Sequence, residues 1–282
     1  MSRSGRCKRT RPGRSWGKKD KPCDPADPAD RRCGSWWDHI LLDPETKLIV
    51  TLVVGRRTAD TALEAFLDFY TRTDGQLPAL ITTDEYAPYF SVIVSVYGVH
   101  KGDLELTDAE KAEFGWEQLP LRYFPVEIAY ATVQKERERG HVVRVEHHLR
   151  LGTAEQVAET LQPGLTAGTI NTSYVERWIG TNRHFNARKA RKVYTFSKDL
   201  VFHVAVTWLV VVFYNFAWTP HPLREQIQTD PPRYHYRTPA MAAGLTREPW
   251  SLTDILRYPI YRREIYSTHR KCRRRKKKSR KA

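Results

Sequence analysis

Apolar positions between residues 36 and 54 follow a strand-like pattern. Two runs rich in aromatic and β-branched residues, 36–42 and 48–54, flank a turn that contains Pro44. Such runs around a turn-forming residue are typical of a β-hairpin. We therefore expect two antiparallel strands at the start of the folded region.

The apolar spacing then changes to a helical period. Apolar residues recur every three or four positions from Leu63 to Tyr70, which predicts a helix with Thr58 as its N-cap. The short apolar run at 77–84 predicts a buried strand whose carboxyl end is Asp84. A further helix is expected after it, because Pro88 is tolerated in a first turn.

The second half of the chain repeats this change of period. Residues 130–152 alternate around the charged sequence ERERG and predict a long β-hairpin. Helices are expected at 153–162 and 173–190. The Val-rich segment 198–216 does not distinguish strand from helix by period, but its length favours a helix. A turn and a short helix are expected at TPAMAAGL, residues 238–245.

This order of elements predicts an α/β chain with a mixed sheet flanked by helices. We expect an irregular basic segment at 1–35, a core at 36–218, an extension at 219–261 and a basic tail at 262–282.

The most apolar run, VAVTWLVVVFY at 204–214, is too short to span a bilayer. With no apolar run behind the basic N-terminus and no paired cysteine pattern, a cytoplasmic protein is expected.

The net charge of +15 is concentrated at the two ends of the chain. Residues 1–19 hold eight basic residues and no acid, and residues 262–282 hold twelve basic residues and one acid. Residues 20–261 are close to neutral, with 27 basic and 31 acidic residues. Blocks of like charge stay disordered and commonly bind nucleic acid. We expect disordered basic termini that contact nucleic acid, and an incidental solvated tail is the alternative.

Two acids have alternative interpretations. Asp84 at a strand end is placed like a ligand-binding residue of an open sheet, yet TTD before EYAPY is also a good helix N-cap. Glu176 lies near the start of the segment 171–192, in which six Lys or Arg residues follow it and no other acid occurs. It is either a first-turn acid favoured by the helix dipole or a metal ligand, with Arg183 two turns further on the same face.

Six sequence strings resemble bacterial insertion-sequence transposases of the DDE class, in the insertion sequence one lineage. The resemblance covers about residues 17–256. The strings are CDPADPAD, WDHILLDPETKLIV, VVGRRTADTALEAF, LITTDEYAPY, NTSYVERWIGTNRHFNARKARKVYTFSKD and TPAMAAGL. The family resemblance implies a ribonuclease-H-like core in which three acids bind two divalent metals, Mg²⁺ or Mn²⁺, for DNA cleavage and strand transfer.

The resemblance assigns roles residue by residue. Asp84 corresponds to the second acid and Glu176 to the third, and both would bind metal. Arg183 resembles the basic residue that follows the glutamate and contacts DNA phosphate. Other residues implied to line the DNA path are Arg177, Asn182, Arg188, Lys189, Arg191 and Lys192.

The first acid is where the chain departs from the family. The family has an aspartate on its first core strand, and counting back from Gly17 puts Thr10 in that place. The segment 1–16 has no acid and no apolar strand. Asp38 is the nearest substitute on a core strand, and its alternative interpretation is an ordinary acid of a half-exposed hairpin. Loss of one member of a catalytic set removes most of the rate.

The sequence therefore predicts a DNA transposase that cuts and joins the ends of its own element, impaired by loss of the first aspartate. Its partners would be element-end and target DNA, and it would be a nucleoid-associated homo-oligomer when active. A non-catalytic DNA-binding remnant is the first alternative. An RNA-binding protein with a nuclease-like core is a weaker one.

Overall fold

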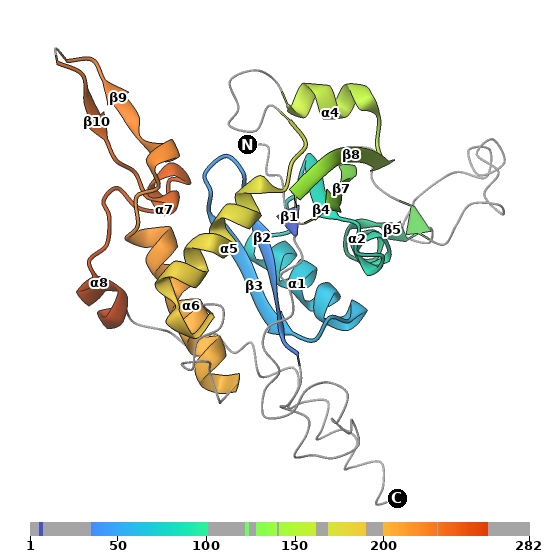
Figure 1. The fold of residues 1–282 in the computed structure, drawn as a ribbon, viewed down its shortest axis with the longest axis horizontal. Coiled ribbons are helices and arrows are strands. Elements are labelled where there is room, and N and C mark those ends of the chain that lie inside the picture. The colour runs from blue at the N-terminus through green and yellow to red at the C-terminus, as the bar shows by residue number, and fades with distance from the viewer. Residues whose placement is uncertain are drawn as a thin grey trace, which may run out of the picture. The chain divides into compact units, whose positions relative to one another are not determined.

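The computed structural model describes residues 35–100, 128–139, 141–161, 169–189, 200–229 and 231–258, together with the backbone of Arg6–Cys7 and Arg122–Tyr123 (Figure 1). The chain divides into two compact units, Met1–Pro249 and Trp250–Ala282. All elements that carry the candidate site belong to the first unit. The predicted basic tail and most of the predicted N-terminal segment lie outside the described residues.

A six-stranded mixed sheet organises the first unit, with the strand order β3-β2-β1-β4-β7-β8. The pairs β1–β2, β2–β3 and β7–β8 are antiparallel, whereas β1–β4 and β4–β7 are parallel. The strands are β1 (Arg6–Cys7), β2 (Trp37–Leu42), β3 (Ile49–Gly55), β4 (Leu80–Asp84), β7 (Ala129–Glu138) and β8 (His141–Leu151). Both predicted hairpins and the predicted strand ending at Asp84 are confirmed.

Strand β1 corrects one expectation. The sequence of residues 1–16 indicated no strand, yet Arg6 and Cys7 pair with Thr82 and Thr83 of β4. Cys7 also pairs with Leu41 of β2. Backbone hydrogen bonds do not depend on apolar side chains, so a basic segment can form a strand. This strand lies between β2 and β4, and the hydrophobic pattern did not predict it.

Helices cover both faces of this sheet, and the alternation of side chains along each strand decides which residues they meet. On one face, α1 (Ala59–Arg72) and α2 (Pro88–Tyr97) pack over Leu41 and Ile81. On the other face, α5 (Ser173–Phe185) and α6 (Leu200–Phe216) pack over Ile40 and Leu42. The short helix α4 (Ala154–Thr160) places Val157 against Leu80 and Ala131. The predicted mixed sheet flanked by helices is confirmed.

Helix boundaries follow local capping chemistry. Thr58 accepts a hydrogen bond from the backbone N–H of Thr61 and begins α1 as expected. Gly75, with φ +73°, follows its end in the left-handed conformation that glycine adopts without steric cost. The predicted helix 173–190 is shorter, because α5 ends at Phe185 and the 3-10 turn η4 (Ala187–Lys189) follows.

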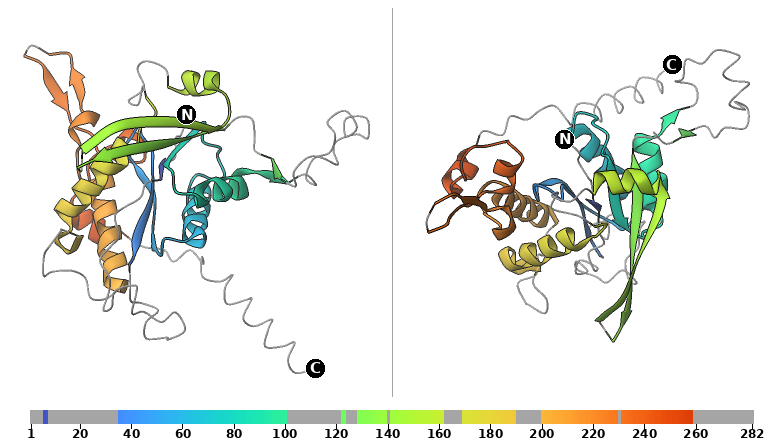
Figure 2. Two further views of the ribbon diagram at one scale, coloured as in Figure 1. Left: turned by 45° about the vertical axis from the view of Figure 1, so that its right-hand side comes forward. Right: turned by 90° about the horizontal axis from the view of Figure 1, so that it is seen from above.

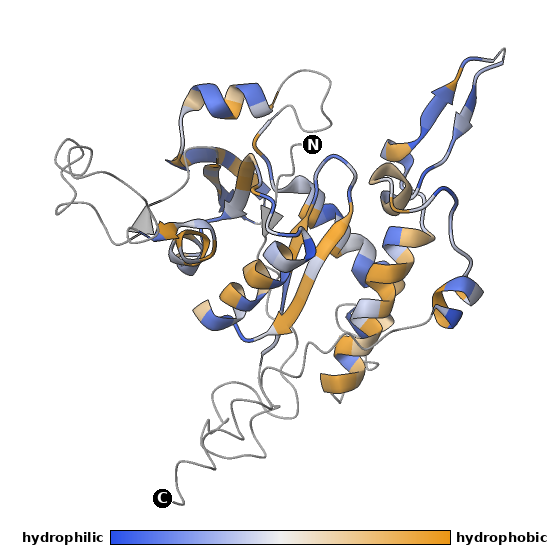
Figure 3. Cartoon of the chain, turned by 180° about the vertical axis from the view of Figure 1, so that it is seen from behind, coloured by the Kyte–Doolittle hydropathy of each residue, from blue (hydrophilic) through white to orange (hydrophobic). Residues whose placement is uncertain are grey.

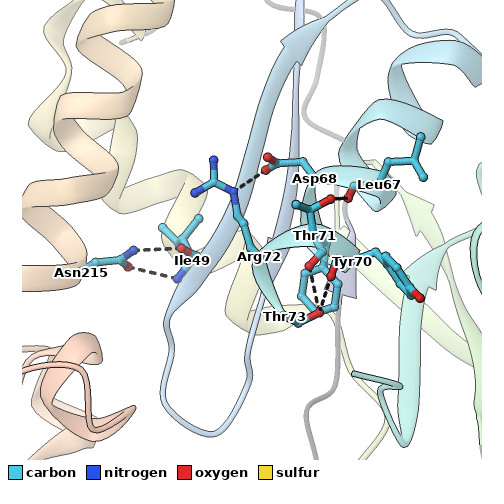
Figure 4. Close-up of polar contacts among 9 residues, drawn as sticks. Ile49, Leu67, Asp68, Tyr70, Thr71, Arg72, Thr73 and Asn215 are labelled. Atoms are coloured by element: carbon cyan, nitrogen blue, oxygen red, sulfur yellow. Dashed lines mark hydrogen bonds and ion pairs between the residues drawn. The ribbon is translucent and has the colours of Figure 1, made fainter. Parts of the chain in front are cut away.

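Helix α6 is tied to the sheet by one polar side chain. The buried Asn215 accepts a hydrogen bond from the backbone N–H of Ile49 at 3.0 Å and donates one to its carbonyl at 2.9 Å (Figure 4). These two bonds satisfy both backbone groups of the first residue of β3. Figure 3 shows that α6 and the central strands hold much of the apolar sequence.

The helical segment around α6 is longer than the sequence analysis expected. Leu200–Leu223 spans 24 residues and is, by length and composition alone, able to cross a membrane; it is the one such segment in the described part of the chain. The expectation considered only the eleven-residue run 204–214, and the segment that passes this test is longer. Core helices pass the same test of length and composition, and Val211 and Tyr214 of α6 are buried against the sheet.

Short elements complete the two units. In the first unit they are β5 (Val99–His100), β6 (Arg122–Tyr123), η5 (His221–Leu223), β9 (Glu225–Ile227), β10 (Arg233–His235) and α7 (Pro239–Ala242). The β9–β10 hairpin was not predicted from the sequence. The second unit contains α8 (Leu252–Arg257), beside which Trp250 stacks on Tyr258.

Candidate functional site

Asp84 is the last residue of β4, as predicted, and it does not cap the next helix. Helix α2 begins at Pro88, its N-cap residue is Ala87, and no side chain makes a capping hydrogen bond there. The N-cap interpretation of Asp84 is therefore wrong. The residue is half-buried and its Oδ1 atom is inaccessible to solvent. A carboxylate held at the carboxyl end of a parallel strand is suitably placed to act as a ligand.

Strand pairing identifies the side chains that share a face with Asp84. Asp84 pairs with Val133 of β7, and Lys135 lies two residues further along β7. Alternate residues of a strand point to the same face, so Asp84, Val133 and Lys135 share one face of the sheet. The small apolar residues Ala129 and Ala131 precede them in the same row. The ammonium group of Lys135 therefore extends from an apolar row near the end of β4, and Figure 2 shows hairpin β7–β8 running on beyond that end.

Glu176 reaches this face from helix α5. Its Oε1 atom accepts a hydrogen bond from Nζ of Lys135 at 2.8 Å. The two side chains are 20% exposed for Lys135 and 35% exposed for Glu176. Glu176 is thus more than a solvated first-turn acid. Lys135 connects this glutamate to the sheet face that carries Asp84, although 92 positions separate the two acids in the sequence.

Asp38 belongs to the same face, nearer the other side of the sheet. Leu41, Cys7 and Thr83 lie side by side on three strands. Because β2 runs opposite to β4, Ile40 is level with Asp84, and Asp38 lies two residues past the end of β4. Two strand spacings, about 10 Å, separate β2 from β4. Asp84 and Asp38 therefore lie near one end of one sheet face, and Lys135 links Glu176 of α5 to the same face.

Asp38 is held by a buried counter-ion. Its Oδ2 atom accepts a hydrogen bond from Nζ of Lys189 in η4, and the two side chains are only 11% and 10% exposed. Asp38 is therefore less exposed than the alternative interpretation expected, and its ion pair with Lys189 is the kind of contact that an ordinary structural acid makes. Burial is the largest effect on Lys189 and lowers its pKa, whereas the charge of Asp38 raises it.

The predicted DNA-contacting residues separate into surface and interior positions. Arg177 and Arg188 are exposed, and Arg183 is half-buried. The side chain of Asn182 is buried at 2% exposure, and Lys189 is directed at Asp38. The interpretation of Asn182 and Lys189 as surface contacts to DNA does not agree with this burial. Arg191 and Lys192 lie outside the described residues.

Sequence reasoning missed two residues of this region, Lys135 and His203. Lys135 was taken as one charge of a charged hairpin, although its place in the row Ala129, Ala131 and Val133 was visible in the alternation. His203 of α6 is buried beside the Asp38–Lys189 pair. Burial is the main cause that lowers its pKa to about 4, the positive charge of Lys189 lowers it further, and Asp38 opposes both.

His203 makes the stability of the fold depend on pH. The folded state favours its neutral form, since the pKa falls from 6.5 to about 4 on folding. The contribution of His203 to stability is therefore complete above pH 6.5. Up to about 3 kcal/mol of this contribution is lost as the pH falls to about 4. We expect denaturant unfolding curves between these pH values to show this slope. The His203→Gln variant should lose it, and equal slopes in the two proteins would contradict the assignment.

A divalent cation suits the donor atoms of this region. Asp84 and Glu176 supply carboxylate oxygens, which Mg²⁺ prefers, and Mg²⁺ is often held by one or two carboxylates plus substrate phosphates. Within the described ranges no group of three or more His, Cys, Asp or Glu side chains is arranged to hold a metal ion. The chain thus offers two acids of the right kind, with Asp38 engaged by Lys189.

Comparisons with known proteins add no relative. No family model matches the chain, and no curated protein matches it.

Proposed function

We propose that the chain is a DNA-processing protein of the DDE transposase type, with metal-assisted cleavage and strand transfer impaired by loss of the first aspartate. The observation that carries the proposal is the ion pair of Glu176 with Lys135, on the sheet face and at the strand end where Asp84 lies. Acids from two distant motifs thereby approach one region. The mixed sheet with helices on both faces is compatible with a ribonuclease-H-like core.

Under this proposal, the acids would bind a cation and the basic residues would bind DNA phosphates. Asp84 and Glu176 would hold a divalent cation, which would supply positive charge to polarise the phosphodiester and stabilise the negative charge that develops on its oxygens. Arg177 and Arg188 are exposed on α5 and η4 and would contact DNA phosphates. Arg183, two turns after Glu176, would hold the phosphate next to the reacting one. The basic termini would add affinity that does not depend on sequence.

A DNA-binding protein without turnover is the second candidate, and a specific observation favours it. Two of the three acids are ion-paired with lysine, Glu176 with Lys135 and Asp38 with Lys189. Thr10 stands where the family has its first aspartate. Under this candidate the lysines neutralise the carboxylates permanently, and the basic surface alone would act. In both candidates the protein works in the cytoplasm on the nucleoid, and the first acts as a homo-oligomer.

The experiment that separates the candidates incubates the full chain with supercoiled plasmid DNA and Mg²⁺ or Mn²⁺. The transposase proposal predicts nicks that carry a 3′-hydroxyl and disappear when the cation is chelated. If the protein retards the plasmid in a mobility-shift assay but does not nick it, the result supports the non-catalytic candidate. Cleavage of an RNA–DNA hybrid but not of duplex DNA would contradict both.

A further inference from the structure

We propose that Lys135 is an internal counter-ion of Glu176 that nucleic-acid phosphate draws away, so that DNA and a divalent cation bind cooperatively. This inference rests on the proposed function, because it concerns the same acidic site. It assigns to Lys135 a regulatory role that neither the sequence motifs nor the family resemblance assigns.

The geometry makes Lys135 both well oriented and replaceable. Its ammonium group donates a hydrogen bond to Oε1 of Glu176 at 2.8 Å, and Lys135 follows Val133 in the row that begins at Ala129. The pair is partly open, with Lys135 at 20% and Glu176 at 35% exposure. The other lysine–acid pair, Asp38 with Lys189, is only 11% and 10% exposed. A solvated ligand can therefore reach Glu176 without unpacking the core.

Charge determines what the ammonium group does when a cation approaches. A cation on Glu176 would lie within a few ångströms of the Lys135 ammonium, and like charges at that distance repel strongly. Cation affinity therefore stays low while Lys135 remains on Glu176. A phosphate oxygen is a better partner for the displaced ammonium than water, because charge-assisted hydrogen bonds are stronger than neutral ones.

The consequence is a reciprocal coupling between two ligands. If DNA phosphate removes Lys135 from Glu176, DNA raises the affinity for the cation, and the cation raises the affinity for DNA by the same factor. The site then acquires its cation mainly when DNA is bound. Free Mg²⁺ alone would leave the Lys135–Glu176 pair in place.

The test measures Mn²⁺ binding by the intensity of its electron paramagnetic resonance signal, with and without a short DNA duplex. We expect Lys135→Met to bind Mn²⁺ about tenfold or more tightly than the wild type in the absence of DNA, since one adjacent charge is removed. DNA should tighten Mn²⁺ binding to the wild type but not to Lys135→Met. Lys135→Arg, which keeps the charge, should behave like the wild type.

A matched control comes from the same hairpin. Arg144 is 69% exposed and pairs with Glu146 at 2.8 Å, so Arg144→Met removes the same charge at the surface. Mn²⁺ affinity of this variant should equal that of the wild type, because exposed charges are screened by salt. Thermal unfolding of each variant would establish that it is folded before titration.

Failure of the inference is distinguishable from failure of the proposed function. If Lys135→Met binds Mn²⁺ no more tightly than the wild type while Glu176→Gln abolishes binding, the cation site stands and the role of Lys135 is overturned. If Glu176→Gln and Asp84→Asn bind Mn²⁺ as the wild type does, these acids hold no cation, and the proposed function falls with the inference.

Discussion

The Asp84→Asn substitution should lower cation-dependent nicking of plasmid DNA by about 10³-fold or more, because one member of a set that acts together is lost. Asp84 ends β4 and shares a sheet face with Lys135, the partner of Glu176. The asparagine keeps the shape of the side chain and removes its charge. The strand and its packing should therefore remain, and DNA affinity should change little.

The measurement is the initial rate of nicking with Mn²⁺, alongside DNA affinity from a mobility-shift titration. Asp60→Asn is the matched control. Asp60 is exposed in the first turn of α1, on the opposite face of the sheet, so its substitution makes the same change in charge away from the site. Equal nicking rates for Asp84→Asn and the wild type would exclude Asp84 from the reaction. Slower nicking by Asp60→Asn would mean that net charge, and not position, controls the rate.

Local pattern was enough to predict most of the elements. The hairpin of β2 and β3, the Thr58 cap and the strand end at Asp84 follow from spacing within about a dozen residues. In each case the favourable local conformation and the final fold agree, which is typical of natural sequences. The faces of the sheet are also implicit in the alternation, since Ile40 and Leu41 point to opposite sides.

The ion pairs could not be predicted in the same way. Lys135 and Glu176 are 41 positions apart, and Asp38 and Lys189 are 151 positions apart. Their meeting depends on strand order, which the sequence pattern does not specify. The N-cap alternative for Asp84 failed for a related reason. TTD before EYAPY suits a cap locally, but the helix begins only at Pro88, because a Pro at the first helical position needs no backbone N–H partner.

The two long-range ion pairs, Asp38–Lys189 and Lys135–Glu176, differ in how far they are exposed to solvent. The Asp38–Lys189 pair fixes η4 to β2, beneath the surface, and His203 packs beside it. The Lys135–Glu176 pair is partly solvated and lies where α5 begins. One lysine therefore acts as a structural counter-ion, whereas the other is accessible to ligands. The substitution of Lys189 tests the first half of this distinction.

Lys189→Met should lower the free energy of unfolding by about 3–5 kcal/mol, because it leaves the Asp38 carboxylate buried without its counter-ion. Methionine has a similar length and apolar volume, so the packing of η4 against the sheet changes little. Chemical denaturation monitored by far-ultraviolet circular dichroism would measure the loss. Arg144→Met, which breaks an exposed pair, should cost at most about 1 kcal/mol.

The double variant Asp38→Asn with Lys189→Met decides whether charge or packing causes the loss. With the carboxylate replaced by a neutral amide, no charge stays uncompensated, and most of the lost stability should return, since neutral groups bury at lower cost than an isolated ion. If the double variant is as unstable as Lys189→Met alone, the lysine stem and not its ammonium group stabilises η4. The ion pair with Asp38 would then contribute little to the stability of the fold.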